Sequence, residues 1–302
     1  MVNEVALPMF WNRLRVSLEM IKFEHSVFAL PFALTSALLA FRVNPVEWAV
    51  AASKLLWIVV AMVSARSAAM AFNRVLDAEM DAKNPRTKMR HIPAGELSKG
   101  FAWSFVVGAA LVFLLASWML NSLCLLLAPV ALGVVFFYSY TKRFTSLSHL
   151  VLGLSLGIAP AAAWIAVTGS LDLRILWLVA AVTFWTAGFD IIYSCQDFEF
   201  DRNHGLFSLP RRFGIASALG ISRVLHAAMV GCLLALVAAF HLGWLSMAGV
   251  GAVILLLIYE HSLVRPKDLS RVNAAFFTVN GYVSVLLFVF WAADIYLLRV
   301  GV

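Results

Sequence analysis

The chain has 302 residues, of which 63% are hydrophobic and only 13% are charged. Soluble domains are about 45–50% apolar and about 25% charged, so this composition excludes a soluble globular fold. The formal net charge is +7. Because the basic residues gather in segments between apolar runs, membrane topology explains this charge more simply than nucleic acid, and no nucleic-acid partner is expected.

Seven long apolar segments follow one another along the chain: Ser26–Phe41, Trp48–Phe72, Phe101–Thr141, Phe144–Leu171, Ile175–Phe189, Val224–Tyr259 and Val272–Ala293. A helix needs roughly 20 residues to cross a bilayer core. The third and sixth segments are too long for one crossing, so each predicts a helical hairpin, with turns at Asn121-Ser122 and at His241–Gly243. The sequence therefore predicts an all-α integral membrane protein, a bundle of nine transmembrane helices with cytoplasmic cap loops.

The first twenty residues differ from a signal peptide, because they contain Glu4 and Glu19 and lack a cleavable apolar core with a small-residue site. Apolar side chains recur in this region at helical spacing, at Phe10, Leu14, Leu18 and Ile21. This spacing predicts that residues 1–25 form an amphipathic helix lying in the membrane interface. No segment remains for a second domain, so residues 1–302 are expected to form one transmembrane domain.

Basic residues are distributed unevenly between the two sides of this predicted bundle. With a cytoplasmic amino terminus, eighteen of the 23 Lys and Arg residues fall in inside segments and four in outside segments, and Arg66 lies within a span. This bias follows the positive-inside rule. It predicts a multi-pass protein of the prokaryotic inner (cytoplasmic) membrane, with its carboxyl terminus outside and its chemistry facing the cytoplasm. The three cysteines show no paired spacing, so neither a disulfide framework nor a cysteine metal site is expected.

Acidic residues concentrate in two cytoplasmic segments, roughly Asn73–Gly100 and Asp190–Gly214. Each segment carries a triplet spaced four residues apart, and the two triplets are Asn73, Asp77 and Asp81, and Tyr193, Asp197 and Asp201. If the preceding helix continues, each triplet lies on one face with neighbours about 5–6 Å apart. Like charges at that spacing repel unless a cation lies between them. One such pair is compatible with solvated loop carboxylates, but two matching pairs on one membrane side favour a site.

Oxygen ligands of this kind suit Mg²⁺, which is usually held by one or two carboxylates while phosphate oxygens complete its shell. A diphosphate also requires cationic donors. Basic residues follow both motifs and the intervening hairpin: Lys83, Arg86, Lys88, Arg90, Lys142, Arg143, Arg202, Arg211 and Arg212. Each alone is explained by topology, but together with the carboxylates they predict a cradle for a metal-bound diphosphate.

Two stretches, Asn73–Thr87 (NRVLDAEMDAKNPRT) and Tyr193–Asp201 (YSCQDFEFD), resemble the two aspartate-rich motifs of the UbiA family of membrane prenyltransferases. Three further matches are Tyr138–Arg143, Ser208–Gly214 and Phe277–Gly281. The resemblance spans nearly the whole chain. It implies a nine-helix bundle with a cytoplasmic cap, Mg²⁺ as cofactor, and transfer of a prenyl group from a polyprenyl diphosphate to an electron-rich aromatic ring.

By this resemblance the two motifs hold the metal and the diphosphate. Asp77, Asp81, Asp197 and Asp201 are the implied Mg²⁺ ligands and catalytic residues, and Tyr193 orients a motif carboxylate or shields the allylic cation. The implied substrate-binding residues are Asn73, Arg66, Arg86, Lys142, Arg143 and Asp190. The apolar helix faces would provide a dry channel for the isoprenoid tail, open sideways to lipid.

Two of these residues keep more than one interpretation. Arg66 lies two helical turns before Asn73 on the same face, and a charge within a span is a functional hypothesis by default. It either meets an acceptor carboxylate, orders the first motif, or forms an internal ion pair or snorkels towards an aqueous cavity. Asp190 acts either behind a metal ligand or as a base.

The acceptor is predicted to be an aromatic acid of the hydroxybenzoate or naphthoate type, in respiratory quinone biosynthesis. The segments Met20–His25 and Ala29–Phe32 resemble the menaquinone-pathway relatives more than the ubiquinone enzymes. Haem, chlorophyll and archaeal-lipid prenyl transfer remain alternatives within the family. Outside it, a transporter would place relay carboxylates in mid-span, and a CDP-alcohol phosphotransferase would carry one compact aspartate run, which this sequence lacks.

Overall fold

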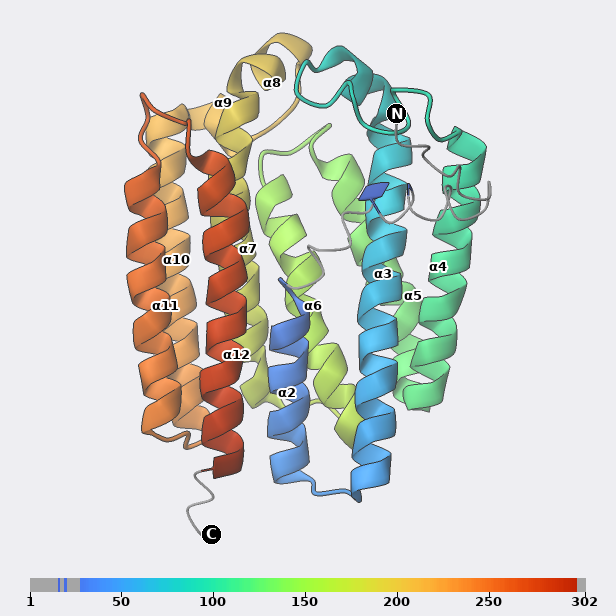
Figure 1. Cartoon of the computed structure of the whole chain (residues 1–302), viewed down its shortest axis with the longest axis vertical. Helices are drawn as coiled ribbons and strands as arrows, with labels where there is room; N and C mark the ends of the chain where they lie inside the picture. Colours follow the sequence, from blue (N-terminus) through green and yellow to red (C-terminus); the bar gives the residue numbers. More distant parts are fainter. Residues whose placement is uncertain (1–15, 17–18, 21–27, 298–302) are drawn as a thin grey trace, which may run out of the picture.

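The computed structural model describes residues 16, 19–20 and 28–297, and in this part of the chain the regular elements are helices, with no strand. The α-helices lie side by side in a bundle (Figure 1). Their bounds are α2 Leu30–Val43, α3 Trp48–Lys83, α4 Lys99–Leu120, α5 Ser122–Thr141, α6 Ser148–Thr168, α7 Leu176–Ser194, α8 Phe198–His204, α9 Leu209–Phe213, α10 Ile215–Ala239, α11 Trp244–Leu263 and α12 Asn280–Leu297. Short 3₁₀ helices, η2 Leu173–Ile175 and η3 Cys195–Asp197, flank α7, and a π-helix, η4 Ala274–Val279, precedes α12.

Membrane-spanning length is reached by eight helical stretches among the described residues. The apolar helix α2 has 14 residues and is shorter than a full span. The all-helical membrane fold is confirmed, whereas the count of nine crossings remains a prediction that depends on α2. The predicted interfacial helix over residues 1–25 lies outside the described residues, apart from positions 16, 19 and 20.

Both predicted hairpins are confirmed. Asn121 separates α4 from α5, and its side chain accepts a hydrogen bond from the Cys124 backbone N–H at 2.8 Å, which caps the new helix. The Asn121 amide also donates to the Ile165 carbonyl at 2.8 Å and so fixes the turn to the end of α6. Between α10 and α11, His241 adopts a positive φ of 49°, which reverses the chain.

The two motif-bearing segments, which start at Asn73 and Asp190, begin within the preceding helices α3 and α7. Helix α3 continues for 36 residues to Lys83, because no helix breaker occurs before Pro85. Helix α7 continues to Ser194, tightens into η3 and resumes as α8. Gly205 ends α8 with a left-handed φ of 74°, a conformation that favours glycine.

One end of the bundle is covered by a cap made of the segment after α3 (residues 84–98) together with α8 and α9 (Figure 1). The Phe207 N–H donates to the Lys142 carbonyl at 2.8 Å and joins this cap to the end of α5. The α2–α3 turn lies at the opposite end (Figure 1). The cap places both aspartate motifs at the same end of the bundle, and the cytoplasmic location of this end remains a prediction.

Close helix packing positions α7 against α6. A Cβ at Gly153 would lie 2.2 Å from the Thr183 carbonyl oxygen, and one at Gly157 would lie 2.2 Å from the Thr183 Oγ1. Glycine at these positions lets the two backbones approach, as is common between membrane helices. Because α7 carries Asp190 and Tyr193, this packing fixes one wall of the site.

Candidate active site

A cavity of about 420 Å³ opens within the bundle beneath the cap. All the predicted site residues line it: Arg66, Asn73, Asp77, Asp81, Arg86, Lys142, Arg143, Asp190, Tyr193, Asp197 and Asp201. Its lining also includes apolar side chains farther down the bundle, among them Met62, Leu120 and Leu156. The cavity therefore joins a charged region at the cap to an apolar region that extends towards the α4–α5 turn.

The first motif lies on the cavity face of α3, because the helix continues through it. The Asn73 amide donates to Asp77 Oδ2 at 3.0 Å, and Arg143 Nη2 donates to Asp77 Oδ1 at 3.0 Å. Arg90 Nη1 lies 2.7 Å from both carboxylate oxygens of Asp81. Each carboxylate of the first motif thus has a guanidinium partner. The two partners, Arg143 and Arg90, come from different loops.

The second motif is joined to the first through Arg86. Its Nε donates to Asp197 Oδ1 at 2.9 Å, its Nη2 donates to Asp197 Oδ2 at 2.6 Å, and its Nη1 donates to the Tyr193 hydroxyl at 2.9 Å. The Asn84 amide adds a hydrogen bond to Asp197 Oδ1 at 3.2 Å. Burial opposes the charged form of Arg86, but the hydrogen bonds and charge of Asp197 outweigh it and hold the pKa of Arg86 above its usual value.

Asp201 is the motif carboxylate with a vacant acceptor. The residue is 3% exposed, and its Oδ2 has no hydrogen-bond partner among the described residues. A buried carboxylate oxygen of this kind is costly unless a donor or a cation meets it. The four motif carboxylates supply oxygen donors only, which is the donor set that Mg²⁺ prefers. The residues therefore fit a hard divalent cation.

Lys142 lies among negative groups at the start of the loop after α5. Burial alone would lower the pKa of its ammonium, but the surrounding groups raise the pKa above its usual range: Tyr138, Asp190, Asp201 and Asp197. Lys142 is therefore a firmly charged cation on the cavity wall. A diphosphate is an anion that such a group can hold.

Asp190 is held from behind by a histidine in α6. His149 Nδ1 lies 2.6 Å from Asp190 Oδ2, and the Leu209 backbone N–H donates to His149 Nε2 at 3.4 Å. Because Nε2 accepts, the hydrogen is on Nδ1 and donates to Asp190. The pair links the cavity wall to the first residue of α9.

Arg66 faces the cavity without a partner at Nε, taking the described residues as a whole. Two polar residues that follow Arg66 on α3, Asn73 and Asp77, have other partners. The Asn73 amide donates to Asp77 and to Ser139, and Asp77 also accepts from Arg143. This arrangement favours a ligand for Arg66 over a role in bracing the first motif.

Aromatic side chains line the cavity beside Tyr193 of the second motif. Phe276 and Phe277 belong to the π-helix η4, and the Phe276 ring lies 4.3 Å from the Tyr193 ring and 5.1 Å from the Phe189 ring, between centroids. π-helical turns occur frequently at functional sites, because they reorient side chains. Here η4 brings two rings against Tyr193, next to the guanidinium of Arg86.

The predicted diphosphate cradle is smaller than the sequence suggested. Within the described part of the chain, Arg86, Arg90, Lys142 and Arg143 line the cavity, and the other predicted cations do not: Lys83, Lys88, Arg202, Arg211 and Arg212. For these five basic residues the positive-inside bias remains the prediction. Sequence analysis did not single out Asn84, His149 or Arg74. Asn84 and Arg74 lie within the first motif, whereas His149 is a lone histidine in an apolar span.

Comparison with known proteins identifies the family to which the chain belongs. The model of the UbiA prenyltransferase family matches residues 29–292. A protein of Burkholderia mallei named 4-hydroxybenzoate octaprenyltransferase is 32% identical over 211 residues, which cover 70% of this chain and 73% of that protein. A protein of the same name from Pseudoalteromonas translucida is 30% identical, covering 74% of this chain and 76% of the relative.

Solved structures share the fold. The apo structure of a UbiA homologue from Aeropyrum pernix superposes with a TM-score of 0.81 at 34% identity, over 90% of this chain and 98% of that one. A UbiA homologue from Archaeoglobus fulgidus, solved with GPP and Mg²⁺ bound, gives a TM-score of 0.73 at 18% identity, over 93% of this chain and 99% of that one.

Proposed function

Because the chain belongs to the UbiA prenyltransferase family, we propose that it transfers a polyprenyl group from an isoprenoid diphosphate to an aromatic acid of the hydroxybenzoate type, in ubiquinone-type quinone synthesis. The observation that carries this proposal is the continuity of the cavity, in which paired aspartates and cations adjoin an apolar region. A prenyl diphosphate has the same division between an anionic head and an apolar tail. Family membership decides against the transporter and the CDP-alcohol phosphotransferase.

The acceptor class rests on the names of relatives. Both relatives described above are named for 4-hydroxybenzoate. The naphthoate acceptor of the menaquinone branch stays a prediction from the segment around Met20–Phe32, most of which precedes the continuously described residues. A hydroxybenzoate is therefore the first acceptor to test and a naphthoate the second.

Asp77, Asp81, Asp197 and Asp201 would hold Mg²⁺ at the cap end of the cavity. When bound, Mg²⁺ supplies Lewis-acid stabilisation to the diphosphate leaving group. The vacant Oδ2 of Asp201 supports this assignment. Mg²⁺ also accompanies GPP in the structure of the Archaeoglobus fulgidus homologue.

Arg86, Lys142 and Arg143 would bind the diphosphate and neutralise its charge as the carbon–oxygen bond breaks and the electron pair leaves with the diphosphate. Each of these cations now pairs with, or lies among, motif carboxylates. Carboxylate and phosphate oxygens would therefore share the same donors. Tyr193, backed by Phe276, presents an aromatic face beside the head group that can shield the allylic cation.

The ring of the acceptor then forms a carbon–carbon bond with the allylic carbon and loses a proton. Asp190 lines the cavity and would take this proton, with His149 Nδ1–H holding its second oxygen at 2.6 Å. Arg66 would bind the acceptor carboxylate, since its Nε faces the cavity without a partner in the described part of the chain. The apolar lining keeps water from the cation.

The test is transfer of radiolabelled geranyl diphosphate in membranes that contain the protein, with Mg²⁺ and a panel of acceptors. We expect prenylated 4-hydroxybenzoate, and we expect no product from 4-hydroxybenzamide, which keeps the ring and the hydroxyl but lacks the carboxylate. Product from a dihydroxynaphthoate alone would transfer the proposal to the menaquinone branch. Absence of product with every aromatic acid would overturn the acceptor class.

A further inference from the structure

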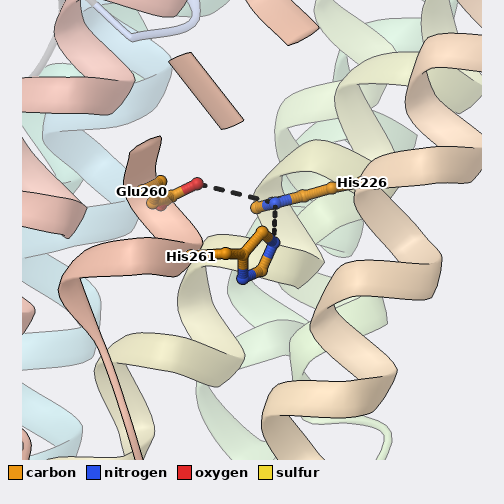
Figure 2. A group of neighbouring side chains, drawn as sticks. All are labelled: His226, Glu260 and His261. Atoms are coloured by element: carbon orange, nitrogen blue, oxygen red, sulfur yellow. Dashed lines mark hydrogen bonds and ion pairs between the residues drawn. The ribbon is translucent and has the colours of Figure 1, made fainter. Parts of the chain in front are cut away.

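A second polar cluster lies among the helices on the other side of α7. It contains His226 on α10 with Glu260 and His261 on α11 (Figure 2). His226 is 2% exposed and Glu260 is 0% exposed, and none of the three, all of which are described residues, lines the prenyl cavity. The proposed prenyl transfer therefore leaves this cluster without a role.

The ligand atoms of the cluster converge on one point. His226 Nδ1 lies 3.0 Å from His261 Nε2 and 3.5 Å from Glu260 Oε2, and one ligand atom from each residue lies within 4.8 Å of the others (Figure 2). A tetrahedral metal with bonds of about 2.0–2.1 Å places its ligand atoms about 3.3 Å apart. Two edges of the triangle are already close to this value.

The hydrogen on His226 points away from that centre. His226 Nε2 lies 3.3 Å from the Trp185 carbonyl oxygen, which only accepts, so Nε2 carries the hydrogen. Nδ1 of the neutral ring is then a lone pair facing Glu260 Oε2, an oxygen without a hydrogen-bond partner among residues 28–297. Two buried lone pairs that face one another are satisfied by a shared cation.

Supporting hydrogen bonds orient the other ligand atoms. The Asn280 amide donates to Glu260 Oε1 at 2.8 Å, and Trp185 Nε1 donates to Asn280 Oδ1 at 2.7 Å. Together with the bond from His226 to Trp185, these contacts orient both the carboxylate and one imidazole. Metal-binding histidines and carboxylates are usually oriented in this manner.

The backbone of α7 also makes room for the cluster. A Cβ at Gly188 would lie 2.3 Å from His226 Nε2, so any other residue there would displace the ring. The third ligand, His261, is only partly buried and lies near the end of α11.

From these contacts we propose that His226, Glu260 and His261 form a binding site for a divalent transition-metal ion of the zinc class. Two imidazoles and one carboxylate suit zinc, whereas Mg²⁺ prefers oxygen ligands alone. The site is therefore distinct in chemistry from the aspartate motifs. Arg223 on α10 acts electrostatically on His261 and opposes a cation there, so the affinity depends on the Glu260 carboxylate as the anionic ligand.

The bound ion would have a structural consequence for the prenyl cavity. Asn280 also donates to the carbonyls of Ala275 and Phe276, at 3.1 and 3.2 Å, within the π-helix η4. Through Asn280 the ion would fix α10 and α11 to the wall that carries Phe276. This connection predicts that the ion raises stability and is not consumed in the reaction.

The experiment is Zn²⁺ binding to the full chain in detergent or nanodiscs, measured by competition with a chromophoric chelator in a large excess of Mg²⁺. We expect one bound Zn²⁺ per chain, a rise in the thermal midpoint on adding Zn²⁺, and tetrahedral d–d bands when Co²⁺ replaces it. His261→Asn and Glu260→Gln should each weaken binding at least about tenfold. Glu260→Gln keeps an oxygen for Asn280 and so preserves the supporting bond.

The matched control is His241→Asn, the same replacement at an exposed histidine whose φ of 49° suits asparagine. It should leave the affinity and the Zn²⁺-dependent midpoint unchanged. Stoichiometric binding that is lost equally in His241→Asn, or that disappears in Asp77→Asn, would overturn the proposal, as would folded wild-type protein that binds no Zn²⁺. In the last case His261 Nε2–H donates to His226 Nδ1, and the cluster is a buried hydrogen-bonded network.

Discussion

Arg86 and Asp197, 111 residues apart in the chain, form a two-point ion pair, with Nε 2.9 Å from Oδ1 and Nη2 2.6 Å from Oδ2. The third nitrogen of the same guanidinium donates to the Tyr193 hydroxyl. One side chain from the cap after α3 therefore fixes two residues of the second motif. This fork joins the two motifs into one site.

The fork predicts that lysine cannot replace Arg86. Arg86→Lys keeps the charge but loses the paired geometry, and each charge-assisted hydrogen bond is worth about 1.5–3 kcal/mol. We expect kcat/KM for the prenyl diphosphate to fall about 10- to 100-fold. Steady-state kinetics with Arg202→Lys, the same change at an arginine outside the cavity, serve as control. Equal values of kcat/KM for the two variants would show that Arg86 does not act in the site.

The vacant oxygen of Asp201 predicts a metal-dependent phenotype. Asp201→Asn should raise the Mg²⁺ concentration needed for half-maximal activity and lower kcat at least about a hundredfold, because charge neutralisation by a metal is worth several kcal/mol. Chelation should abolish turnover of the wild type. Glu199→Gln, at an exposed carboxylate of α8 outside the cavity, should titrate with Mg²⁺ like the wild type. An unchanged Mg²⁺ titration of Asp201→Asn would exclude this residue as a ligand.

Much of the fold follows from the sequence, because a bilayer requires long apolar runs and the breaks between them are chemically distinct. Asn121 ends one helix and caps the next, as its place between two apolar runs predicts. The 3₁₀ turn at Cys195–Asp197 and the π-helix at Ala274–Val279 have no such signal. Both depend on contacts between distant segments, which periodicity along the chain does not contain.

The site was predicted as a set of residues but not as a set of pairs. Spacing by four places Asp77 and Asp81 on one face of a helix, and α3 continues through both residues to Lys83. The fold of the cap over the bundle determines which arginine pairs with which aspartate. Arg90 pairs with Asp81, nine residues away in the chain, and Arg86 pairs with Asp197, 111 residues away. His149 could not be predicted as a site residue, because it is a lone histidine in an apolar span and only the tertiary structure brings it to Asp190.

The close approach of α6 and α7 predicts a packing-sensitive position. Gly153→Ala would bring its Cβ to 2.2 Å from the Thr183 carbonyl oxygen, so a backbone must shift. Overpacking of this kind typically costs about 1–3 kcal/mol, and we expect a lower thermal midpoint in detergent. Gly133→Ala is the matched control, because a Cβ there meets nothing within 4 Å. Equal midpoints for the two variants would contradict the observed helix contact.

Orientation in the membrane is predicted from the bias in basic residues and is tested by reporter fusions. A fluorescent protein that folds only in the cytoplasm should be active when fused after Gly95, within the cap. The same reporter at Val302 should be dark, because nine crossings place the carboxyl terminus outside. A bright fusion at Val302 with a bright cap would indicate an even number of crossings between the two fusion sites, in conflict with the seven candidate spans that lie between them in the described residues. The opposite result at both positions would reverse the proposed orientation.

Arg66 separates recognition of the acceptor from ionisation of the donor. If its guanidinium binds the acceptor carboxylate, Arg66→Ala should raise KM for 4-hydroxybenzoate at least about tenfold and leave KM for the prenyl diphosphate nearly unchanged, because one substrate alone loses a contact. Arg66→Lys should recover only part of the loss, since a point charge reproduces a two-point contact poorly. A parallel loss for both substrates and for Mg²⁺ would instead assign Arg66 to the first motif, although Asn73 and Asp77 already have Ser139 and Arg143 as partners. If both KM values and the Mg²⁺ requirement stay at wild-type values in correctly inserted protein, Arg66 has neither role. Its guanidinium is then a snorkelling group that extends to water within the cavity.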